Sequence, residues 1–594
     1  MITFNKHEGD PDMKGLSPGS IHHLPWLEYR HALSDGRVCL RLRTGKWEFV
    51  RVYARVTSNY AMPDPFEVAV DYPMTVAFRD GCFEYYEAVF KPRDPRVKYL
   101  FVLVSETLTL KLDGAGLHVG ADAFEDISEA FAFSYAYPAD PMPGWARGCV
   151  GYQVFPDRFR REGGEELGLE PWGSDRVQSE NRFGGNLKGM RAAVPYLKEL
   201  GVTMVYVTPI FASDSAHRYN TFDYYQIDPL LGTLEDLKDL VGELHANDMR
   251  LVLDGVFNHC GLQFAPFADA RERGEQSAYR SWFFFDSDIS CGYETFGHEP
   301  YMPKLNLGHE GCAEYFLEVG RYWMEQCGVD GWRLDVSPEV WPAFWRKFRT
   351  MMKSVNAESL MVAECWDDSR EWLCPGDMFD STMHYVLSRA LWNRFCRHCI
   401  TTEAFDGVVN RAAMMYPHRN QEVLWTFLGS HDTERFLTRA GGNERMLRAA
   451  VFFQFTCLGA PIIYYGDELG MEGGEDPDCR RPMAWDRAES SGIRRHFARL
   501  ARLRGEHEAL RLGAFRTVEA RENGLYAYLR LSDGEWLLCV LNTALEPLRG
   551  WLTLPEDKAG LAVLHDWYGG CDLTVRDGAV LVSLDVGEGM ILGV

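Results

Sequence analysis

Four apolar runs in this sequence end in, or run into, a carboxylate. They are residues 251–259 (LVLDGVFNH), 331–336 (GWRLDV), 361–366 (MVAECW) and 427–432 (FLGSHD). An ionised carboxylate is expensive to bury unless it is paired or used. By itself, one such aspartate at the end of a strand is more often a cap or half of an ion pair. Several predicted strands that each end in a carboxylate indicate an active site at the carboxyl edge of a parallel barrel, where these groups could act as acids, bases or nucleophiles.

The elements that must position these carboxylates alternate along the central part of the chain. Strand-like runs cover residues 202–210, 249–257, 360–364, 423–429 and 461–465. Between them lie helical patterns at 234–244 and 344–352, the first with its leucines spaced to share one face. This alternation, sustained over about 350 residues, predicts an α/β fold, a (β/α)₈ TIM barrel.

Other segments interrupt or flank the barrel. Residues 258–307 are rich in aromatic residues and glycine and are too long for an ordinary loop, so we expect an inserted subdomain after the third strand. Short alternating strands with turn residues between them predict β-sandwich domains at both ends. The predicted boundaries are 1–125 for the N-terminal sandwich, 126–147 for a proline-containing linker, 148–505 for the barrel and 506–594 for the C-terminal sandwich.

The charge of the chain limits its partners. Its 594 residues include 62 lysine and arginine against 86 aspartate and glutamate residues, a formal net charge of −24. Nucleic-acid binding needs basic patches, so we expect no nucleic acid. The balance fits a protein that handles a neutral substrate, and it also fits mere solubility. No run approaches the ~18 apolar residues of a membrane helix, so we expect no membrane association.

The cysteines and the N-terminal residues indicate a compartment. Fifteen cysteines are scattered without the spacing of a disulfide framework. Several, such as Cys457 and Cys539, lie in apolar runs, where cysteine behaves as a small hydrophobe. Cys396 and Cys399 form a C-x-x-C pair, but no second pair completes a zinc site. The sequence begins without an apolar leader. We therefore expect a cytoplasmic protein without disulfides.

The central motifs resemble those of the α-amylase family of glycoside hydrolases (glycoside hydrolase family 13) over nearly all of residues 150–505. Within that family the chain is similar to the neopullulanase, cyclomaltodextrinase and maltogenic amylase subgroup. This closer similarity rests on 151–159 (GYQVFPDRF), 302–306 (MPKLN), 473–480 (GGEDPDCR) and Glu339-Val340. The motifs are long and follow the order found in the family.

The resemblance implies a retaining glycosidase with Asp335 as nucleophile and Glu364 as general acid/base, a pair that must lie about 5 Å apart. Arg333 precedes Asp335 by two residues and shares its side of the strand. A cation there lowers the pKa of a carboxyl group. Glu364 has apolar neighbours in sequence, Trp366 included, and such surroundings raise the pKa of an acid. We therefore expect Asp335 to be ionised and Glu364 protonated.

Further roles follow from the same resemblance. Asp432, the third catalytic carboxylate, binds sugar hydroxyls and helps to distort the ring. His431 and His259 hydrogen-bond to the same sugar. Asp254 orients Arg333 or a neighbouring group.

The sugars on either side are assigned in the same way. Tyr219 matches the tyrosine that stacks under the reacting sugar, with His217 beside it, although packing alone is an alternative. Asp476 and Arg480 match a pair that contacts the next sugar outward.

On the leaving-group side the resemblance implies aromatic platforms. Trp366 and Phe296 are the candidates, with simple core aromatics as the alternative. Glu339 is a candidate for acceptor binding, with an ordinary acid at a helix N-terminus as the alternative.

Several residues depart from the subgroup pattern. Asp367 replaces the usual histidine after the acid, Pro338 lies in a changed segment after Asp335, and Asn220 replaces an aspartate. Many relatives hold calcium after the first strand, but here residues 160–166 read RREGGEE and Asn186 replaces an aspartate. Calcium needs several converging oxygen atoms, so we doubt this site and expect no required cofactor and no metal ligands.

The resemblance thus implies an enzyme that cleaves α-1,4-glucosidic bonds of maltooligosaccharides, cyclodextrins and pullulan, and transfers glycosyl groups. One alternative is a member that is predominantly a transglycosylase. Another, of a different class, is a non-catalytic sugar-binding or scaffold relative, although such proteins typically lack the catalytic carboxylates that this chain retains. The expected partners are small α-glucan oligosaccharides and a second copy of the chain, joined as a homodimer through the N-terminal domain.

Overall fold

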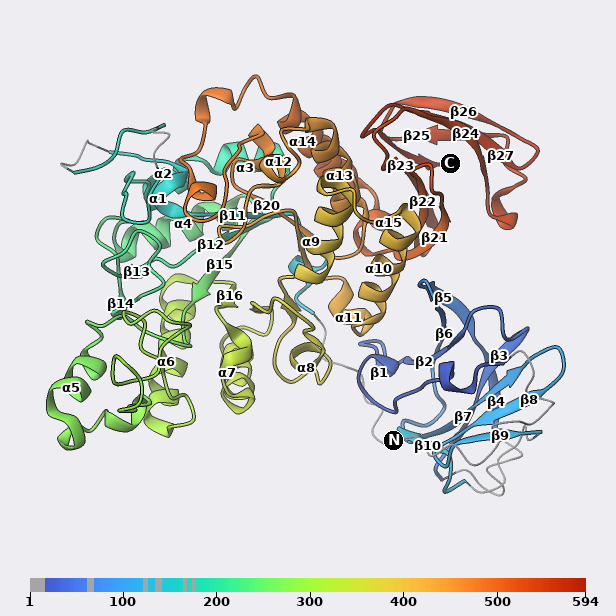
Figure 1. Cartoon of the computed structure of the whole chain (residues 1–594), viewed down its shortest axis with the longest axis horizontal. Coiled ribbons are helices and arrows are strands. Elements are labelled where there is room, and N and C mark those ends of the chain that lie inside the picture. Colours follow the sequence, from blue (N-terminus) through green and yellow to red (C-terminus); the bar gives the residue numbers. More distant parts are fainter. Residues whose placement is uncertain (1–15, 61–68, 121–126, 134–141, 164–167, 174–176) are drawn as a thin grey trace. The chain divides into compact units, whose positions relative to one another are not determined.

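The computed structural model describes the chain except for residues 1–15, 61–68, 121–126, 134–141, 164–167 and 174–176 (Figure 1). The chain divides into two compact units, each described by itself below. The first comprises Met1–Pro141, Cys374–Gly376 and Glu403–Gln421, and the second comprises Met142–Leu373, Asp377–Thr402 and Glu422–Val594. Within the described ranges, no helix has the length and apolar character needed to cross a membrane.

A parallel sheet of eight short strands forms the centre of the second unit. A parallel bridge between Met383 and Trp425 joins the two edges of this sheet, which forms a nearly closed barrel. Most strand residues are buried, as expected for a parallel sheet covered on both faces. In sheet order the strands are β18 (Ser381–Thr382), β17 (Leu360–Ala363), β16 (Gly331–Leu334), β15 (Arg250–Gly255), β12 (Met204–Val207), β11 (Gly151–Val154), β20 (Ala460–Tyr464) and β19 (Trp425–Phe427).

Helices alternate with these strands along the chain. In α4 (Leu234–Ala246), Thr233 and Asp236 form a capping box, and Leu237 and Leu244 are among the leucines on its buried face. Further helices of this unit include α2 (Leu187–Ala192), α3 (Val194–Leu200), α6 (Glu310–Cys327), α7 (Pro342–Val355), α9 (Tyr385–Leu391), α13 (Glu444–Thr456) and α14 (Gly492–Glu506).

Two excursions from the barrel help to build the site. The first follows β12 as a hairpin of β13 (Phe211–Ala212) and β14 (Asp223–Ile227). The second is the predicted insertion between β15 and α6, which contains α5 (Ala265–Arg273). A bridge between His259 and Lys304 joins the two ends of this insertion, which returns the chain to the edge of the barrel that it left.

The first unit contains two antiparallel sheets. One has the order β1-β2-β6-β5 and the other β4-β3-β7-β8-β9, with β10 also paired to β7. A hydrophobic core that includes Leu40, Val52, Tyr99 and Phe101 draws residues from both sheets. The strands are β1 (Arg30–Ala32), β2 (Val38–Gly45), β3 (Arg51–Ser58), β4 (Val70–Pro73), β5 (Thr75–Arg79), β6 (Phe83–Phe90), β7 (Val97–Val104), β8 (Thr109–Leu112), β9 (Leu117–Val119) and β10 (Phe131–Phe133).

The last part of the second unit is an antiparallel β domain. Its strands are β21 (Ala514–Ala520), β22 (Leu525–Ser532), β23 (Glu535–Asn542), β24 (Leu548–Thr553), β25 (Val563–Asp566), β26 (Cys571–Arg576), β27 (Ala579–Leu584) and β28 (Gly589–Gly593). Arg530 fastens this domain to the barrel, because its guanidinium donates to the carbonyls of Thr456 and Cys457 at 2.5 and 2.6 Å. The predicted fold class, a barrel with an insertion after its third strand and β domains at both ends, is confirmed.

Candidate active site

The predicted strand-end carboxylates meet at one edge of the barrel. Asp254 lies in β15, Asp335 and Glu364 directly follow β16 and β17, and Asp432 follows β19. Asp335, Glu364 and Asp432 line a cavity of about 810 Å³. Eight of the predicted binding residues also line it: His217, Tyr219, His259, Phe296, Glu339, Trp366, Asp476 and Arg480. The other three, Asp254, Arg333 and His431, are buried behind this wall.

One guanidinium holds three of the carboxylates together. Arg333 is fully buried, and its Nη1 donates to both oxygens of Asp254 at 2.9 and 3.0 Å and to Asp335 Oδ1 at 2.7 Å. Its Nη2 lies 3.0 Å from Glu364 Oε1. Asp335 and Glu364 therefore contact the two ends of one rigid, planar group. A single buried cation for three carboxyl groups means that they cannot all be ionised at little cost.

The expected pKa pattern of this pair is wrong in one respect. Burial, with the negative charge of Glu364 next, raises the pKa of Asp335 well above its usual value, and Arg333 opposes this shift. Burial also raises the pKa of Asp254 to about 6. The expectation was wrong because it treated Arg333 as a partner of Asp335 alone. In the structure the same guanidinium also contacts Asp254 and Glu364. The negative charge of Glu364 on the same guanidinium therefore opposes ionisation of the Asp335 carboxyl group.

A strained residue positions the predicted acid. Val336 has φ of 46°, in the left-handed region that β-branched residues rarely adopt. This conformation directs its backbone N–H onto Glu364 Oε2 at 2.8 Å. Trp366 Nε1 donates to the other oxygen of the same carboxyl group at 3.1 Å. Strain of this kind is typical of functional sites, where the surrounding structure maintains it.

Tyr219 belongs to a buried network as well as to the cavity wall. Its hydroxyl donates to Asp254 Oδ2 at 3.0 Å and lies 2.6 Å from His431 Nε2. The Gln153 side-chain amide donates to His431 Nδ1 at 2.6 Å, which assigns the imidazole proton to Nε2. Burial lowers the pKa of His431 well below its usual value, so the ring is neutral. Tyr206 donates to Asp254 Oδ2 at 2.5 Å.

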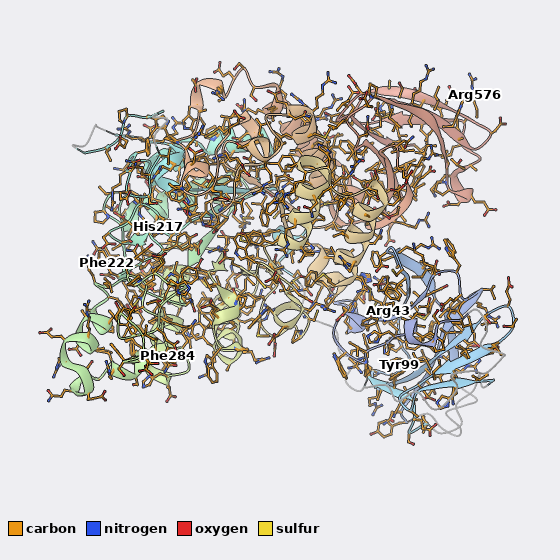
Figure 2. All side chains as sticks on the ribbon, in the orientation of Figure 1. Arg43, Tyr99, His217, Phe222, Phe284 and Arg576 are labelled. Atoms are coloured by element: carbon orange, nitrogen blue, oxygen red, sulfur yellow. The ribbon has the colours of Figure 1, made fainter. Side chains whose placement is uncertain are left out.

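The other two histidines of the site are also neutral. Burial lowers the pKa of both His217 (Figure 2) and His259 to about 3. The backbone N–H of Tyr219 donates to His217 Nδ1 at 3.1 Å, which leaves the proton on Nε2. His259 Nε2 is buried and has no hydrogen-bond partner among the described residues. The His259 ring contributes to the cavity wall, whereas its Nε2 atom is covered by the surrounding protein.

Asp432 belongs to a second charged group at the rim. Arg480 Nη2 lies 3.3 Å from Asp432 Oδ1 and 2.9 Å from Asp476 Oδ2. Arg480 Nε also donates to the His431 carbonyl at 2.7 Å, so the guanidinium is held in place on two sides. Asp432 Oδ2 is 3.2 Å from His431 Nε2. The predicted pair Asp476 and Arg480 is thus brought together beside the third carboxylate.

The aromatic side chains of the site are partly exposed. Trp366 is 40% exposed, and its ring stacks on Tyr385 with centroids 3.9 Å apart and planes at 14°. Phe296 stacks on His259 at 4.8 Å. Trp366 and Phe296 both line the cavity, and Phe296 also packs against a small hydrophobic cluster that includes Tyr219 and Met302.

Glu339 is joined to the inserted segment. Its Oε2 accepts from Lys304 Nζ at 2.7 Å, and its side chain lines the cavity. Of the residues that depart from the subgroup pattern, Asp367 has an 89% exposed side chain at the cavity rim, 3.4 Å from Arg389. Asn220 is buried, and its Oδ1 accepts from Ser213 at 2.8 Å.

Comparison with known proteins decides the family. The profile described as "Alpha amylase, catalytic domain" matches residues 153–507, and that described as "Alpha amylase, N-terminal ig-like domain" matches residues 18–137. The chain belongs to the α-amylase family of glycoside hydrolases. Neopullulanase 2 of Thermoactinomyces vulgaris is 41% identical to it, over 96% of this chain and 99% of the relative.

Two further relatives extend this α-amylase family comparison. A cyclomaltodextrinase of a Bacillus species is 37% identical, over 88% of this chain and 95% of the relative. A solved cyclomaltodextrinase structure matches with a TM-score of 0.90 at 33% identity, over 97% of this chain and all of the other. The predicted family and subgroup resemblance is therefore confirmed.

The calcium site of many α-amylase family members does not fit the residues described here. The side-chain oxygen of Asn186 caps α2 by accepting from Gly189 N–H at 2.8 Å, and its amide donates to the Glu162 carbonyl at 2.7 Å. Arg160 Nη2 holds the Glu162 carboxylate at 2.9 Å. These oxygens are engaged by N–H groups and a cation rather than converging on one point, as calcium requires. Residues 164–166 of the predicted stretch lie outside the described residues.

Proposed function

We propose that this α-amylase family hydrolase is a retaining enzyme that cleaves α-1,4-glucosidic bonds of small maltooligosaccharides, cyclodextrins and pullulan, and that it also transfers glycosyl groups. The observation that supports this most is the placement of Asp335 and Glu364 on the two ends of Arg333, at a cavity that Asp432 shares. The names of the relatives, neopullulanase and cyclomaltodextrinase, favour these substrates.

In the first step, Asp335 attacks the anomeric carbon as a carboxylate while Glu364 gives its proton to the glycosidic oxygen. The bond from the anomeric carbon to that oxygen breaks, and a covalent glycosyl ester on Asp335 forms. These roles require the Asp335 carboxyl group to be ionised and the Glu364 carboxyl group to carry the proton when substrate is bound. The N–H of Val336 and the indole of Trp366 fix the Glu364 carboxyl group for this transfer.

In the second step, Glu364 accepts a proton from water or from a sugar hydroxyl, and that oxygen displaces Asp335 from the anomeric carbon. Two inversions restore the α configuration. Hydrolysis and transfer differ only in which hydroxyl reaches the intermediate. No metal is required for either step, because the carboxyl pair supplies both the nucleophile and the proton.

The shape of the site supports small substrates. Phe296, Glu299, Tyr301 and Met302, all from the inserted segment, line the cavity together with residues from the barrel. Such a wall limits the space available to a branched or granular glucan. Asp432 and Arg480 present hydrogen-bonding atoms to sugar hydroxyls, and Tyr219 offers a ring face for stacking.

The experiment that tests this function is a product profile on maltotriose, β-cyclodextrin and pullulan. Proton NMR at early times should show that the new reducing end appears first as the α anomer. We expect all three substrates to be cleaved, with products no longer than a few glucose units. Initial release of the β anomer would exclude retention, and failure to cleave any of the three would exclude the proposed activity.

Transfer depends on the platform made by Trp366. We expect Trp366→Ala to lower the ratio of transfer to hydrolysis about two- to tenfold, if stacking of an acceptor sugar contributes about as much as the stacking of an aromatic pair, about 0.5–1.5 kcal/mol. The ratio is measured by chromatography of the products formed from maltotriose with added glucose. Trp366→Phe, which keeps a ring to stack on Tyr385, is the matched control and should retain most of the transfer. An unchanged ratio in Trp366→Ala would place the acceptor elsewhere.

The hydroxyl of Tyr219 provides a second test of the site. Tyr219→Phe removes the group that links Asp254 to His431, leaving buried polar atoms without a partner at about 1–3 kcal/mol. We expect kcat/KM on maltotriose to fall about 10–100-fold. Tyr528→Phe, which removes a buried hydroxyl bonded to Thr456 near the C-terminal domain, should leave kcat/KM unchanged. Equal losses in both variants would mean that a general loss of stability, and not the site, is responsible.

The oligomeric state and the location are proposed from the relatives and the composition of the chain. We infer a homodimer joined through the N-terminal domain, from the resemblance to the subgroup, with size-exclusion chromatography coupled to light scattering as the test. A cytoplasmic location is supported by a relative named intracellular maltogenic amylase in Bacillus subtilis. The acidic balance of the chain supports the absence of a nucleic-acid partner.

A further inference from the structure

Two histidines and a cysteine converge in the first unit, on residues that the proposed function does not use. One ligand atom from each of His31, Cys39 and His418 lies within 4.8 Å of the others. His31 and Cys39 are directly opposite each other on the paired strands β1 and β2, so their side chains share one face of the sheet. His418 begins α11 (His418–Gln421), in the Glu403–Gln421 segment of the same unit.

A carboxylate completes the group. Cys39 pairs with Val89 of β6 and Glu87 precedes Val89 by two residues, which places Glu87 on the face that carries Cys39. Glu87 Oε2 lies 3.0 Å from His418 Nε2 and 3.5 Å from Cys39 Sγ. Cys39 Sγ and His418 Nε2 are 3.8 Å apart. These are the spacings of atoms that could share one ion.

We propose that His31, Cys39, His418 and Glu87 bind a structural Zn²⁺ ion. Zinc takes four N, S and O ligands in a tetrahedron, with Zn–S of about 2.3 Å and Zn–N of about 2.0–2.1 Å. This geometry requires ligand atoms about 3.4–3.6 Å apart. The separations among Cys39, His418 and Glu87 are within a few tenths of an ångström of these values, and His31, whose ligand atom lies within 4.8 Å of those of Cys39 and His418, would move closer on binding. A set with one cysteine and two histidines also selects zinc over calcium or magnesium, which prefer oxygen.

The surroundings are consistent with a closed structural site. Cys39 is fully buried, and the His31 side chain is nearly so. His31 Nδ1 is buried without a partner of good hydrogen-bond geometry among the described residues, although the Glu28 backbone lies near the ring. The His31 Nε2 atom receives only a long contact of 3.4 Å from the His418 backbone N–H. The His418 side chain is 28% exposed, which gives an ion a way in.

Arg41 would serve as an outer partner of this site. Its Nε donates to Glu87 Oε2 at 2.7 Å, and its Nη1 donates to the carbonyls of Met414 and Tyr416 at 3.2 Å each. The guanidinium is therefore fixed and can orient the Glu87 carboxylate, as second contacts of metal ligands commonly do. A bound ion would then link the β1-β2-β6 face to α11 through bonds stronger than the present hydrogen bonds.

The test is metal content and metal spectroscopy on the full-length protein. The chain is stripped with a chelator, given Zn²⁺, desalted and analysed by mass spectrometry of the metal. We expect about one Zn²⁺ per chain, with an affinity at least tenfold lower in Cys39→Ser. Cys82→Ser, which alters an exposed cysteine of the same unit, is the matched control and should bind like the wild type.

Co²⁺ provides a readout that does not depend on any variant folding. Bound at this site in the wild type, it should show the charge-transfer absorption of a thiolate ligand together with the visible bands of tetrahedral coordination. Retention of no Zn²⁺, equal retention by Cys39→Ser, or a Co²⁺ spectrum without the thiolate band would each overturn the proposal. None of these measurements uses glycosidase activity, so the result is independent of the proposed function.

Discussion

Asp335→Asn should lower kcat on maltotriose by about 10⁴-fold or more while the unfolding temperature changes little. The amide has nearly the shape of the carboxylate and can still accept from Arg333 Nη1, but it cannot form the glycosyl ester. Removal of a nucleophile from a group of residues that act together costs most of the catalysis. Steady-state kinetics and thermal unfolding measure the two effects. Near-normal turnover in Asp335→Asn would exclude this residue as nucleophile.

Glu364→Gln separates the two carboxyl roles. With an activated leaving group, such as fluoride, this variant should still form the intermediate on Asp335, and added azide should displace it to give an α-glycosyl azide. In Asp335→Asn the azide must attack the substrate directly and should give the β anomer. The anomer identified by NMR therefore assigns each residue. The reverse result would exchange the roles of Asp335 and Glu364.

Arg333→Met should destabilise the protein by about 3–5 kcal/mol at pH 8, because it leaves buried carboxyl groups without their cation. The loss should be smaller at pH 5. Burial already raises the pKa of Asp254 to about 6 and that of Asp335 well above its usual value, and removal of Arg333 raises both further. The folded state then binds more protons than the unfolded chain, so stability falls as pH rises through the folded pKa values.

The control for this prediction is another buried arginine. Arg530 donates only to backbone carbonyls among the hydrogen bonds described for it, at 2.5–2.7 Å. Arg530→Met should therefore destabilise the chain to a similar extent at pH 5 and pH 8. Chemical unfolding of both variants at the two pH values measures the difference. If the loss of unfolding free energy in Arg333→Met is no larger at pH 8 than at pH 5, the guanidinium stabilises the protein through packing and not through its charge.

Much of the fold could be predicted because apolar periodicity marks long elements. The patterns at 234–244 and 360–364 predicted α4 and β17 closely. The barrel strand β18 gave no such signal, since it consists only of Ser381 and Thr382. Its position is determined by parallel pairing with Val362 and Ala363 of β17. A local sequence pattern does not show which distant segments pair.

The site was predictable where a residue ends a strand or belongs to a family motif. Tyr206 and Gln153 were missed although they bond Asp254 and His431. Both lie within buried barrel strands, so the sequence pattern predicts them as core residues. Their role in the site follows only from their hydrogen bonds to polar partners, which the sequence does not show. The pKa of Asp335 was misjudged for a related reason: sequence neighbours show which cation is close, but not how many anions share it.

Because Val336 has a left-handed backbone conformation, thermal stability and catalytic rate favour different residues at position 336. A β-branched residue held there costs about 1–3 kcal/mol, which the rest of the barrel must offset. Selection for thermal resistance alone would favour glycine, which adopts this conformation freely. The same exchange would loosen the amide that fixes the Glu364 carboxyl group. An engineering effort that ranks substitutions by folding stability would therefore choose, at this residue, the change that weakens the proton donor.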